Sequence, residues 1–335
     1  MSRLVTPCVL TEGLRDHEAF QAWRQLQRGD EAPPAIEVLQ RNKKAAVYRL
    51  SALAPDGSDV IAKRARRITL GVERVIYERV LPHVPVPSLR CYGYAGDSDE
   101  EYAWLFLEDA GGDAYVPSHE SHRRLAGQWL GELHLAASSG LGAQLPGRGL
   151  RHYIQVLRDC RAGLNLLSRT ALPAEDVALV GRFVSFCDEI ESSWGAIEGE
   201  CAALPETLVH GDFAIKNVRM RNVAGAQTLV AFDWQFAGVG APATDLAQSI
   251  DRVVSPDLGA YQAVMARVNR RLALRDIERI AACGNVMRVL DQVRWALSGL
   301  RVADPKWVTK AGALLRAYEP MVTATVERVE MELGR

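Results

Sequence analysis

The sequence predicts an α+β protein of two lobes, a small antiparallel sheet followed by a larger, mainly helical lobe. In the first third of the chain, short β-branched runs alternate with turns, and beyond residue 110 apolar side chains recur at helical spacing. With 335 residues and 48% hydrophobic side chains, the chain is long enough for two lobes. We expect an N-lobe of residues 1–108 and a C-lobe of residues 109–335, with Gly111 and Gly112 at the boundary.

Short strands make up most of the predicted N-lobe. The turn signal Pro55-Asp56-Gly57 predicts a hairpin between the two strands that flank it. A single helix, 74–81, is expected before the segment Pro85-Val86-Pro87, which favours an extended backbone. The predicted strands are 35–39, 46–51, 60–63, 89–94 and 102–107.

The predicted C-lobe is helical except for one island. Leu125, Trp129 and Leu133 illustrate the near-helical spacing of its apolar residues. The island contains two short strand-like runs, 207–209 and 229–232. The predicted helices are 122–137, 150–168, 174–197, 243–253, 257–271, 275–302 and 305–332.

The composition excludes several kinds of partner and location. The 40 basic and 41 acidic residues nearly cancel, which argues against nucleic acid or a membrane surface as the main partner. No apolar run approaches the ~20 residues of a membrane span, and the first residues lack the apolar core of a signal peptide. The six scattered cysteines form no CxxC pair. We therefore expect free thiols and a cytoplasmic location, while the oligomeric state stays open.

The most informative motif is His210-Gly211-Asp212 with Asn217 five residues after the aspartate, followed by Asp233 in an apolar, strand-like run. A carboxylate such as Asp212 can accept the proton of an attacking hydroxyl. An amide oxygen and a second carboxylate, Asn217 and Asp233, suit a hard cation such as Mg²⁺. A carboxylate among apolar residues is costly to bury without a cation, which favours a metal role for Asp233. The set indicates phosphoryl transfer, although Asp212 and Asn217 could also be turn residues.

These motifs, in this order, resemble those of the aminoglycoside phosphotransferase and choline-kinase group, small-molecule kinases of the protein-kinase-like fold. The resemblance runs from about residue 35 to the last helices and includes Asp245 in Ala-Thr-Asp-Leu-Ala. It implies that Asp212 is the catalytic aspartate and that Asn217 and Asp233 hold Mg²⁺. For Asp245 it implies a structural role, capping a helix or bracing the catalytic loop.

The resemblance also implies a nucleotide site in the N-lobe. Lys63 in Val-Ile-Ala-Lys would contact the α- and β-phosphates, although a solvated lysine at a strand end would show the same pattern. Its expected partner is Glu73, with Glu78 as the competitor. The backbone carbonyl of Glu108 and the N–H of Ala110 would meet the adenine edge. ATP is the expected cofactor with Mg²⁺, and GTP is left open.

Two departures from the family pattern bear on function. The loop expected at the phosphates, residues 41–46, has no glycine; Lys43 and Lys44 could supply charge there or belong to a solvated turn. Eleven residues separate Asp233 from Asp245, which leaves no room for a protein-kinase activation segment. A small hydroxylated molecule is therefore the expected acceptor. Lys216 could neutralise phosphate charge, pair with Asp212, or point to solvent.

The identity of the acceptor stays open at the level of sequence. An aminoglycoside-like antibiotic or another natural product is the first expectation, which would imply a role in antibiotic resistance. A metabolite such as choline, a sugar or an amino alcohol is the alternative, and a nucleotide-binding pseudokinase without transfer is the rival from another class. Trp234 and Phe236 could stack on a sugar or pack in the core.

A cationic aminoglycoside would need a cleft rich in carboxylates, because each ammonium group must meet acceptor oxygens. Each acidic candidate for such a cleft is also typical of a solvated helix face or loop. These candidates are 188–191, 198–200, Asp251 and Asp257.

Overall fold

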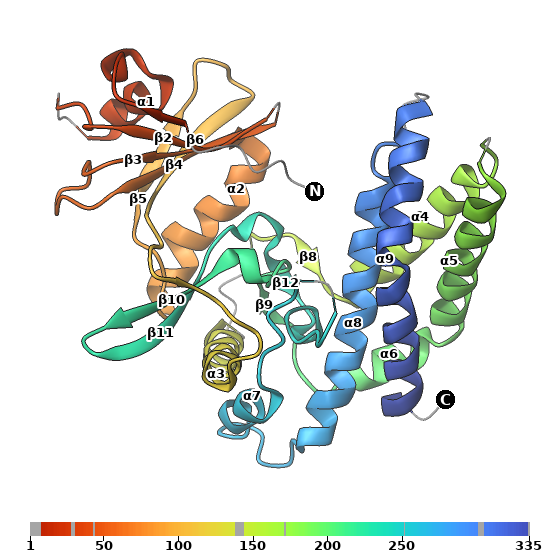
Figure 1. The fold of residues 1–335 in the computed structure, drawn as a ribbon. Helices are drawn as coiled ribbons and strands as arrows, with labels where there is room; N and C mark the ends of the chain where they lie inside the picture. Colours follow the sequence, from red (N-terminus) through yellow and green to blue (C-terminus); the bar gives the residue numbers. More distant parts are fainter. Residues whose placement is uncertain are drawn as a thin grey trace. The chain divides into compact units, whose positions relative to one another are not determined.

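The computed structural model describes residues 8–27, 31–42, 44–137, 144–170, 172–250, 252–300 and 305–333 (Figure 1). Its contacts divide the chain into two compact units. Unit 1 consists of Met1–Ala114 and Asn217–Phe236, and unit 2 of Tyr115–Lys216 and Ala237–Arg335. The segment Asn217–Phe236, far along the chain, thus groups with the N-terminal residues. The division after residue 108 expected from the sequence stays a prediction.

Unit 1 is built on a six-stranded antiparallel sheet of order β1-β2-β3-β4-β6-β5. The predicted hairpin around Pro55-Asp56-Gly57 is its β3–β4 pair. The α+β class predicted from the sequence is confirmed. The elements are β1 (Cys8–Leu10), α1 (Glu18–Leu26), β2 (Ile36–Arg41), β3 (Ala45–Leu50), β4 (Val60–Arg66), α2 (Arg67–Val75), β5 (Cys91–Gly96) and β6 (Tyr102–Glu108).

The two faces of this sheet carry different partners. Ala62 on β4 and Phe106 on β6 are paired in register and join a buried cluster with Phe20 and Trp23 of α1. Because side chains alternate along a strand, Lys63 points to the opposite face, where α2 packs against β4 and β6. The strand period therefore places the lysine opposite the cluster that holds α1.

The helix predicted at 74–81 begins seven residues earlier, at Arg67, so its predicted start is wrong. Its first turns contain β-branched residues and Gly71, which have low helix propensity, and Arg66 gives no side-chain cap. Burial of Leu70 and Glu73 stabilises the helix instead. The helical path continues as a π-turn, Ile76–Val80, and a 3₁₀ turn, Leu81–His83. Neither β1 nor α1 was predicted from the sequence, although the buried Ala19, Phe20 and Trp23 of α1 recur at helical spacing.

A second, three-stranded sheet of unit 1 has the order β11-β10-β7. Its strands are β7 (Asp113–Ala114), β10 (Val218–Val223) and β11 (Ala226–Ala231). Gly112 permits the β7–β10 contact, because its φ is +67° and a Cβ there would lie 2.3 Å from the carbonyl oxygen of Met220. The glycines expected at a domain boundary therefore also have a packing reason.

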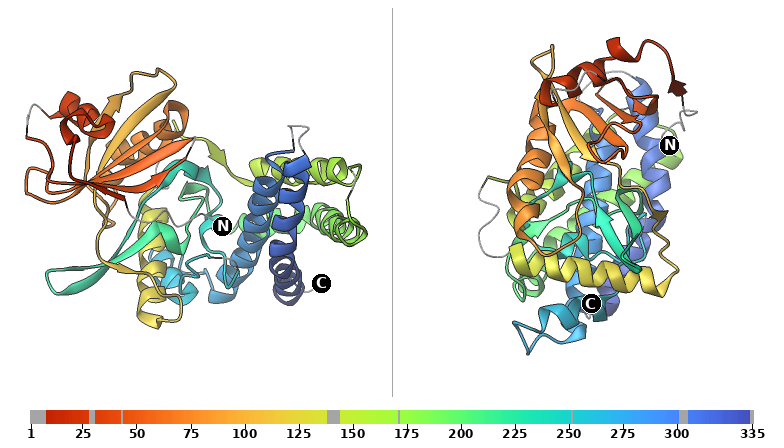
Figure 2. Two further views of the ribbon diagram at one scale, coloured as in Figure 1. Left: turned by 45° about the horizontal axis from the view of Figure 1, so that its top comes forward. Right: turned by 90° about the vertical axis from the view of Figure 1, so that its left-hand side faces the viewer.

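Unit 2 is mainly helical, and α8 lies at its centre. This helix packs against α4 and α9, and the pair α8 and α9 run side by side in all views (Figure 1 and Figure 2). A small sheet of order β8-β12-β9 completes the unit. The elements are α3 (Glu120–Ala137), β8 (Gly147–Arg148), α4 (Leu150–Leu167), α5 (Ala174–Ser192), α6 (Trp194–Cys201), β9 (Thr207–Val209), β12 (Gly238–Gly240), α7 (Leu258–Met265), α8 (Leu274–Leu297) and α9 (Pro305–Leu333).

Two helix predictions in unit 2 are wrong, and a third, 257–271, ends six residues too late because α7 stops at Met265. The pattern at 174–197 covers two helices, because the chain turns at Ser193 between α5 and α6. The helix predicted at 243–253 is replaced by a 3₁₀ turn, Pro242–Asp245, followed by irregular backbone. There Ser249 has a φ of +55°, which a helix does not allow. Buried apolar side chains alone produced the helical pattern in this segment.

The structure also bears on the expectations about membrane spans and cysteines. Within the described residues, no helix is long and apolar enough to cross a membrane. All six cysteines, each within the described ranges, are free thiols.

We predict that Gly284→Ala on α8 lowers the free energy of unfolding by about 2 kcal/mol, in the range of overpacked sites. A Cβ at this position would lie 2.0 Å from the carbonyl oxygen of Ala243. Gly181→Ala on α5 is the matched control, because a Cβ there has open space and alanine favours a helix. Urea unfolding of both variants tests this, and equal stabilities would contradict the close approach.

Candidate active site

Lys63 lies between two carboxylates of unit 1. Its Nζ is 2.6 Å from Oε1 of Glu73 and 2.6 Å from Oδ1 of Asp233. The Glu73 side chain is fully buried, and that of Lys63 is 14% exposed. The structure thus brings together three of the predicted site residues, from β4, α2 and the segment after β11. The competitor Glu78 instead pairs with Arg74 on the surface of its own helix.

The electrostatics of this group keep the lysine charged. Burial by itself lowers the pKa of Lys63, but the charges of Glu73 and Asp233 and their hydrogen bonds outweigh it and raise the pKa. Burial raises the pKa of Glu73, and the nearby lysine opposes this effect. A permanently cationic lysine held by two carboxylates is suited to contact phosphate oxygens.

The hairpin β10–β11 explains why Asn217 and Asp233 are neighbours although sixteen positions apart. Val218 is paired with Ala231 in register, and the N–H of Phe232 donates to the carbonyl of Asn217 at 3.0 Å. Asn217 thus lies opposite Phe232, the residue before Asp233, so Asn217 and Asp233 are both at the open end of the hairpin. Asp233 has a φ of +66°, a left-handed conformation that aspartate tolerates better than most residues.

The donor set at this hairpin end fits Mg²⁺. A carboxylate and an amide supply the oxygen ligands that this hard cation prefers, and phosphate oxygens usually complete its coordination. No cluster of three or more histidine, cysteine, aspartate or glutamate side chains forms a separate metal site in the described ranges. Asn217 is nearly buried, whereas the Asp233 side chain is 23% exposed. The ligand roles stay predictions.

Asp212, the predicted catalytic residue, lies in unit 2 on a loop held by Asp245. The backbone N–H groups of His210 and Gly211 donate to the two carboxylate oxygens of Asp245 at 2.6 and 3.0 Å. Gly211 has a φ of +74°, which lets both groups face the same carboxylate. The N–H of Asp212 in turn donates to Nδ1 of His210 at 3.3 Å. Of the two roles considered for Asp245, the structure shows the brace of the loop.

Two cations hold the Asp212 carboxylate. Arg288 Nη1 is 2.8 Å from Oδ1, and Lys216 Nζ is 3.0 Å from Oδ2. Burial alone would raise the pKa of Asp212, but Arg288 and then Lys216 lower it to about 2. The sequence did not indicate Arg288, because it lies 76 residues away on α8 and looks like one of that helix's ordinary arginines. Of the three options for Lys216, the structure shows the pair with Asp212.

The expected hinge and phosphate loop belong to unit 1. Glu108 ends β6, and its side chain is engaged by the backbone N–H of Arg90 at 2.9 Å and by Arg221 at 2.5 Å. Ala110 is buried and directly precedes Gly111, whose φ is +51°. These positions are compatible with backbone recognition of a base, which stays a prediction.

In the glycine-free loop, Asn42 forms the turn. Its Oδ1 accepts from the N–H groups of Lys44 and Ala45 at 2.8 and 3.0 Å. The Asn42 side chain therefore stabilises the tight turn that a flexible glycine would otherwise allow. Its hydrogen bonds also occupy two N–H groups that could have faced a phosphate. Lys43 lies outside the described residues.

Most of the described acidic candidates for binding a cationic acceptor have structural partners, and Glu189 is exposed. Asp188 and Glu191 pair with Arg161 between α5 and α4, and Glu200 pairs with Arg279 of α8. Glu198 accepts from the indole N–H of Trp194, and Asp257 caps α7 through the N–H of Ala260. Asp251 lies outside the described residues. In the same way Trp234 is fully buried, which assigns it to the core, whereas Phe236 is 40% exposed.

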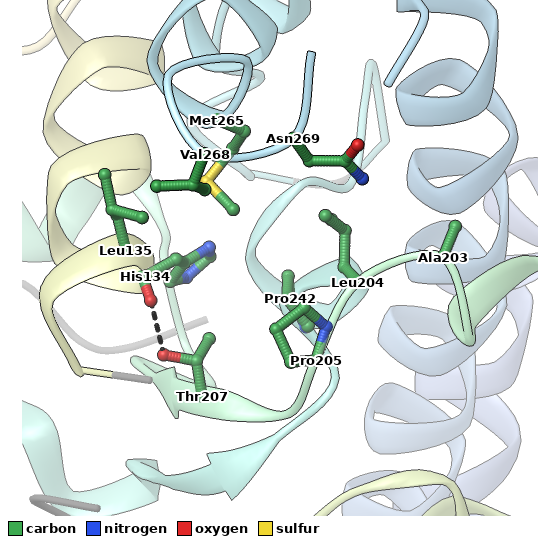
Figure 3. A pocket seen from close by; sticks show the side chains of 10 residues that line it. All are labelled: His134, Leu135, Ala203, Leu204, Pro205, Thr207, Pro242, Met265, Val268 and Asn269. Atoms are coloured by element: carbon green, nitrogen blue, oxygen red, sulfur yellow. Dashed lines mark hydrogen bonds between the residues drawn. The ribbon is translucent and has the colours of Figure 1, made fainter. Parts of the chain in front are cut away.

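Unit 2 contains a cavity of about 80 Å³ with His134, Thr207 and Pro242 in its lining (Figure 3). Buried His134 lines it, with Nδ1 3.0 Å from the hydroxyl of Tyr261 and Nε2 3.5 Å from Oδ2 of Asp245. The Thr207 hydroxyl donates to the backbone carbonyl of His134 at 2.8 Å. The packing role expected for His134 thus includes polar contacts that support the brace. A cavity of this volume has room for roughly two or three water molecules, at about 30 Å³ each.

The chain matches the family described as "Phosphotransferase enzyme family" (APH) over residues 47–283. Because this range covers more than half of the chain, the protein belongs to that family. The resemblance inferred from the motifs is confirmed, and so is the enzyme class, a small-molecule kinase. A search of curated proteins gave no significant match.

Solved structures of similar fold extend over nearly the whole chain. Aminoglycoside 2'-phosphotransferase-IIIa, in its GDP complex, aligns with a TM-score of 0.62 at 15% identity, covering 91% of this chain and 97% of that one. Ethanolamine kinase from Plasmodium vivax aligns with a TM-score of 0.57 at 13% identity, with 93% and 94% covered. Spectinomycin phosphotransferase aligns with a TM-score of 0.53 at 10% identity, with 93% and 99% covered. At such identities these structures show the fold alone.

We predict that Lys63→Met lowers the free energy of unfolding by about 3 kcal/mol, because Glu73 is left buried without a cation. The double variant Lys63→Met/Glu73→Leu should recover most of this loss, since apolar side chains often replace a buried ion pair without cost. Urea unfolding of both variants measures the difference. A double variant no more stable than the single one would contradict the pairing argument.

The depressed pKa of Asp212 predicts a specific pH dependence of stability. Its pKa lies near 2 in the folded protein, below the ordinary 3.8, so its contribution is complete above about pH 4 and disappears as the pH falls through about 2. We expect Asp212→Asn to cost about 2 kcal/mol of unfolding free energy, equally at pH 7 and pH 5, and less at pH 3.

Urea unfolding at these pH values is the measurement. Asp188→Asn is the control, because its exposed ion pair should contribute less than about 1 kcal/mol. A difference that already shrinks between pH 7 and pH 5 would mean that the pKa of Asp212 is not depressed.

Proposed function

We propose that this protein transfers the γ-phosphate of ATP to a hydroxyl group of a small molecule. The observation that carries the proposal is the Lys63 ammonium held by Glu73 and Asp233, each at 2.6 Å. Burying this cation and the Glu73 carboxylate costs several kcal/mol of desolvation free energy per ion. A purely structural protein could avoid that cost with apolar side chains. In a member of a phosphotransferase family, this arrangement is evidence for a site where a lysine and a metal ion hold the phosphates of a nucleotide.

Each residue of the site receives one role in this mechanism. Lys63 contacts the α- and β-phosphates, and Glu73 keeps its side chain in place. Asn217 and Asp233 hold Mg²⁺, which supplies positive charge to the phosphates during transfer. The backbone of Glu108 and Ala110 binds the nucleotide base. The chain's own contribution is mainly position and charge, as expected for phosphoryl transfer.

Asp212 accepts a hydrogen bond from the acceptor hydroxyl and aligns it with the γ-phosphate. With a pKa of about 2 it is a weak base, so it orients the hydroxyl early and receives the proton late, as the bond to phosphorus forms. The loosely bonded transition state of phosphoryl transfer requires little basicity from this group. The brace by Asp245 fixes the loop on which Asp212 lies.

ATP is the proposed donor, and GTP is the second candidate. Similar folds were solved with GDP and, for the streptomycin complex of another aminoglycoside kinase, with ATP. An aminoglycoside-like natural product was the acceptor expected from the sequence, and the similar folds include both aminoglycoside kinases and an ethanolamine kinase. We keep the proposal at a small hydroxylated acceptor. A cytoplasmic location likewise stays a prediction.

We predict that Asp212→Asn reduces turnover by at least about 10²-fold while Mg·ATP affinity changes little, because the hydroxyl loses its acceptor but the nucleotide contacts remain. Asp233→Asn should instead weaken Mg·ATP binding itself. Nucleoside diphosphate release across a panel of hydroxylated compounds, with calorimetry for Mg·ATP and Mg·GTP, measures both.

Equal loss of nucleotide binding in both variants would contradict the separate roles. Tight Mg·ATP binding with no turnover on any acceptor would favour a pseudokinase.

A further inference from the structure

The surroundings of Asp212 in unit 2 hold more than the two cations that touch it. One turn along α8 from Arg288 lies Asp291, which accepts a hydrogen bond from the hydroxyl of Tyr153 at 3.0 Å. Arg294 Nη2 lies 2.9 Å from the other oxygen of the same carboxylate. Arg148, on the neighbouring strand β8, also acts on it: burial raises the pKa of Asp291, and the charges of Arg294, Arg288 and Arg148 oppose that effect.

We define this group as the α8 cation cluster: Arg148, Lys216, Arg288 and Arg294. Three carboxylates accompany it. Asp212 is paired with two of these cations, Asp291 is paired with Arg294, and Asp245 is occupied by the N–H groups of the loop. Nearby His152 stays neutral at pH 7, because burial and Arg148 lower its pKa to about 4.

Within the described part of unit 2, the three carboxylates that accompany the cluster are all engaged by these cations or by backbone N–H groups, so none of the three is free for an ammonium group of a ligand. A polycationic acceptor such as an aminoglycoside needs several such carboxylates, each free to accept hydrogen bonds. At the α8 cation cluster a polycationic acceptor would instead meet arginines and a lysine. Like charges close together cost free energy. The exposed Glu206 lies against the backbone of Gly149 at the start of α4, where solvent screens it.

Two arginines of the cluster still have donors to offer. A guanidinium group carries five N–H donors in a planar fork that matches carboxylate or phosphate oxygens. Among the described residues, Arg148 Nε is buried without a hydrogen-bond acceptor, and Arg148 Nη1 reaches only the ring of His152, at 3.3 Å. Arg294 is 38% exposed and uses one terminal nitrogen for Asp291.

We propose that the acceptor carries an anionic group, a carboxylate or a phosphate, and that Arg148 and Arg294 bind it while Asp212 aligns the hydroxyl. Arg294 follows Arg288 by six positions, a rise of about 9 Å along α8 that one small molecule can bridge. This inference rests on the proposed function, whose acceptor site it specifies. Arg288 is a positioning residue, since it acts through Asp212.

The test uses matched pairs of hydroxyl compounds as acceptors with Mg·ATP: hydroxy acids with their amides, sugar phosphates with the free sugars, and amino alcohols and aminoglycosides as the cationic arm. Nucleoside diphosphate release gives kcat and KM for each. We expect the anionic member of a productive pair to have at least a tenfold higher kcat/KM than its neutral partner. Added salt should reduce this preference, because it screens the charges.

Arg148→Gln and Arg294→Gln should each raise KM for the anionic acceptor about tenfold and change kcat little, whereas a merely structural role would lower kcat or stability. Arg148→Lys should restore part of the affinity because it keeps the charge. Arg182→Gln is the matched control, an exposed arginine of α5 paired with Glu319 outside the cluster. Thermal unfolding of each variant separates misfolding from lost binding. In the described residues Arg148 forms no contact ion pair with a carboxylate, so its replacement breaks none.

Neutral or cationic acceptors that match or exceed the anionic ones would overturn the inference, as would a charge preference that survives both glutamine variants. If Asp212→Asn abolishes turnover of such acceptors, the proposed kinase function stands although the inference fails. No turnover with any anionic acceptor would also overturn the inference, and the binding of Mg·ATP would then decide separately on the proposed function.

Discussion

The ammonium group of Lys63 joins three parts of unit 1 that are distant in sequence: strand β4, helix α2 and the end of the β10–β11 hairpin. Taking this cation and the Glu73 carboxylate out of water costs several kcal/mol per ion, and the cost is offset only if both partners stay at hydrogen-bond distance. The position of α2 on the sheet and the left-handed backbone at Asp233 are consistent with that requirement. A group this costly to bury is better explained by contact with phosphates than by stability.

In unit 2, the arrangement around Asp245 depends on the close approach of two backbone segments rather than on a buried ion pair. Gly284 lets α8 lie against the 3₁₀ turn that ends at Asp245, and buried Asn285 bonds the backbone of Gln248 in the same turn region. One helical turn further, the same helix presents Arg288 to Asp212. The packing of α8 therefore fixes both the brace of the loop that carries Asp212 and the charge around the Asp212 carboxylate.

The charge pattern around Asp212 has consequences for the choice of substrate within a family of shared fold. Similar folds include kinases of cationic aminoglycosides and of ethanolamine, so the fold does not determine the charge of the acceptor. Among the described acidic candidates, Glu191, Glu200 and Asp257 are used in ion pairs or a helix cap, while arginines surround Asp291. The acceptor class thus depends on side chains from α8 and β8 rather than on the motifs common to the family.

The sequence by itself determined the fold class, the family and the order of the motif residues. Strand alternation and turn residues are local signals, and a spacing such as that from Asp212 to Asn217 can be read directly. Prediction from the sequence failed where burial overrode helix propensity, as at the early start of α2. It also failed where apolar residues are buried without forming a helix, as after Asp245.

The pair of Lys63 with Glu73 was expected from the sequence, with Glu78 as competitor, and the structure shows it. Only the tertiary structure showed that Asp245 braces the loop and that Arg288 reaches Asp212. These contacts depend on which helix face packs against which element, and partners 76 residues apart leave no trace in local periodicity.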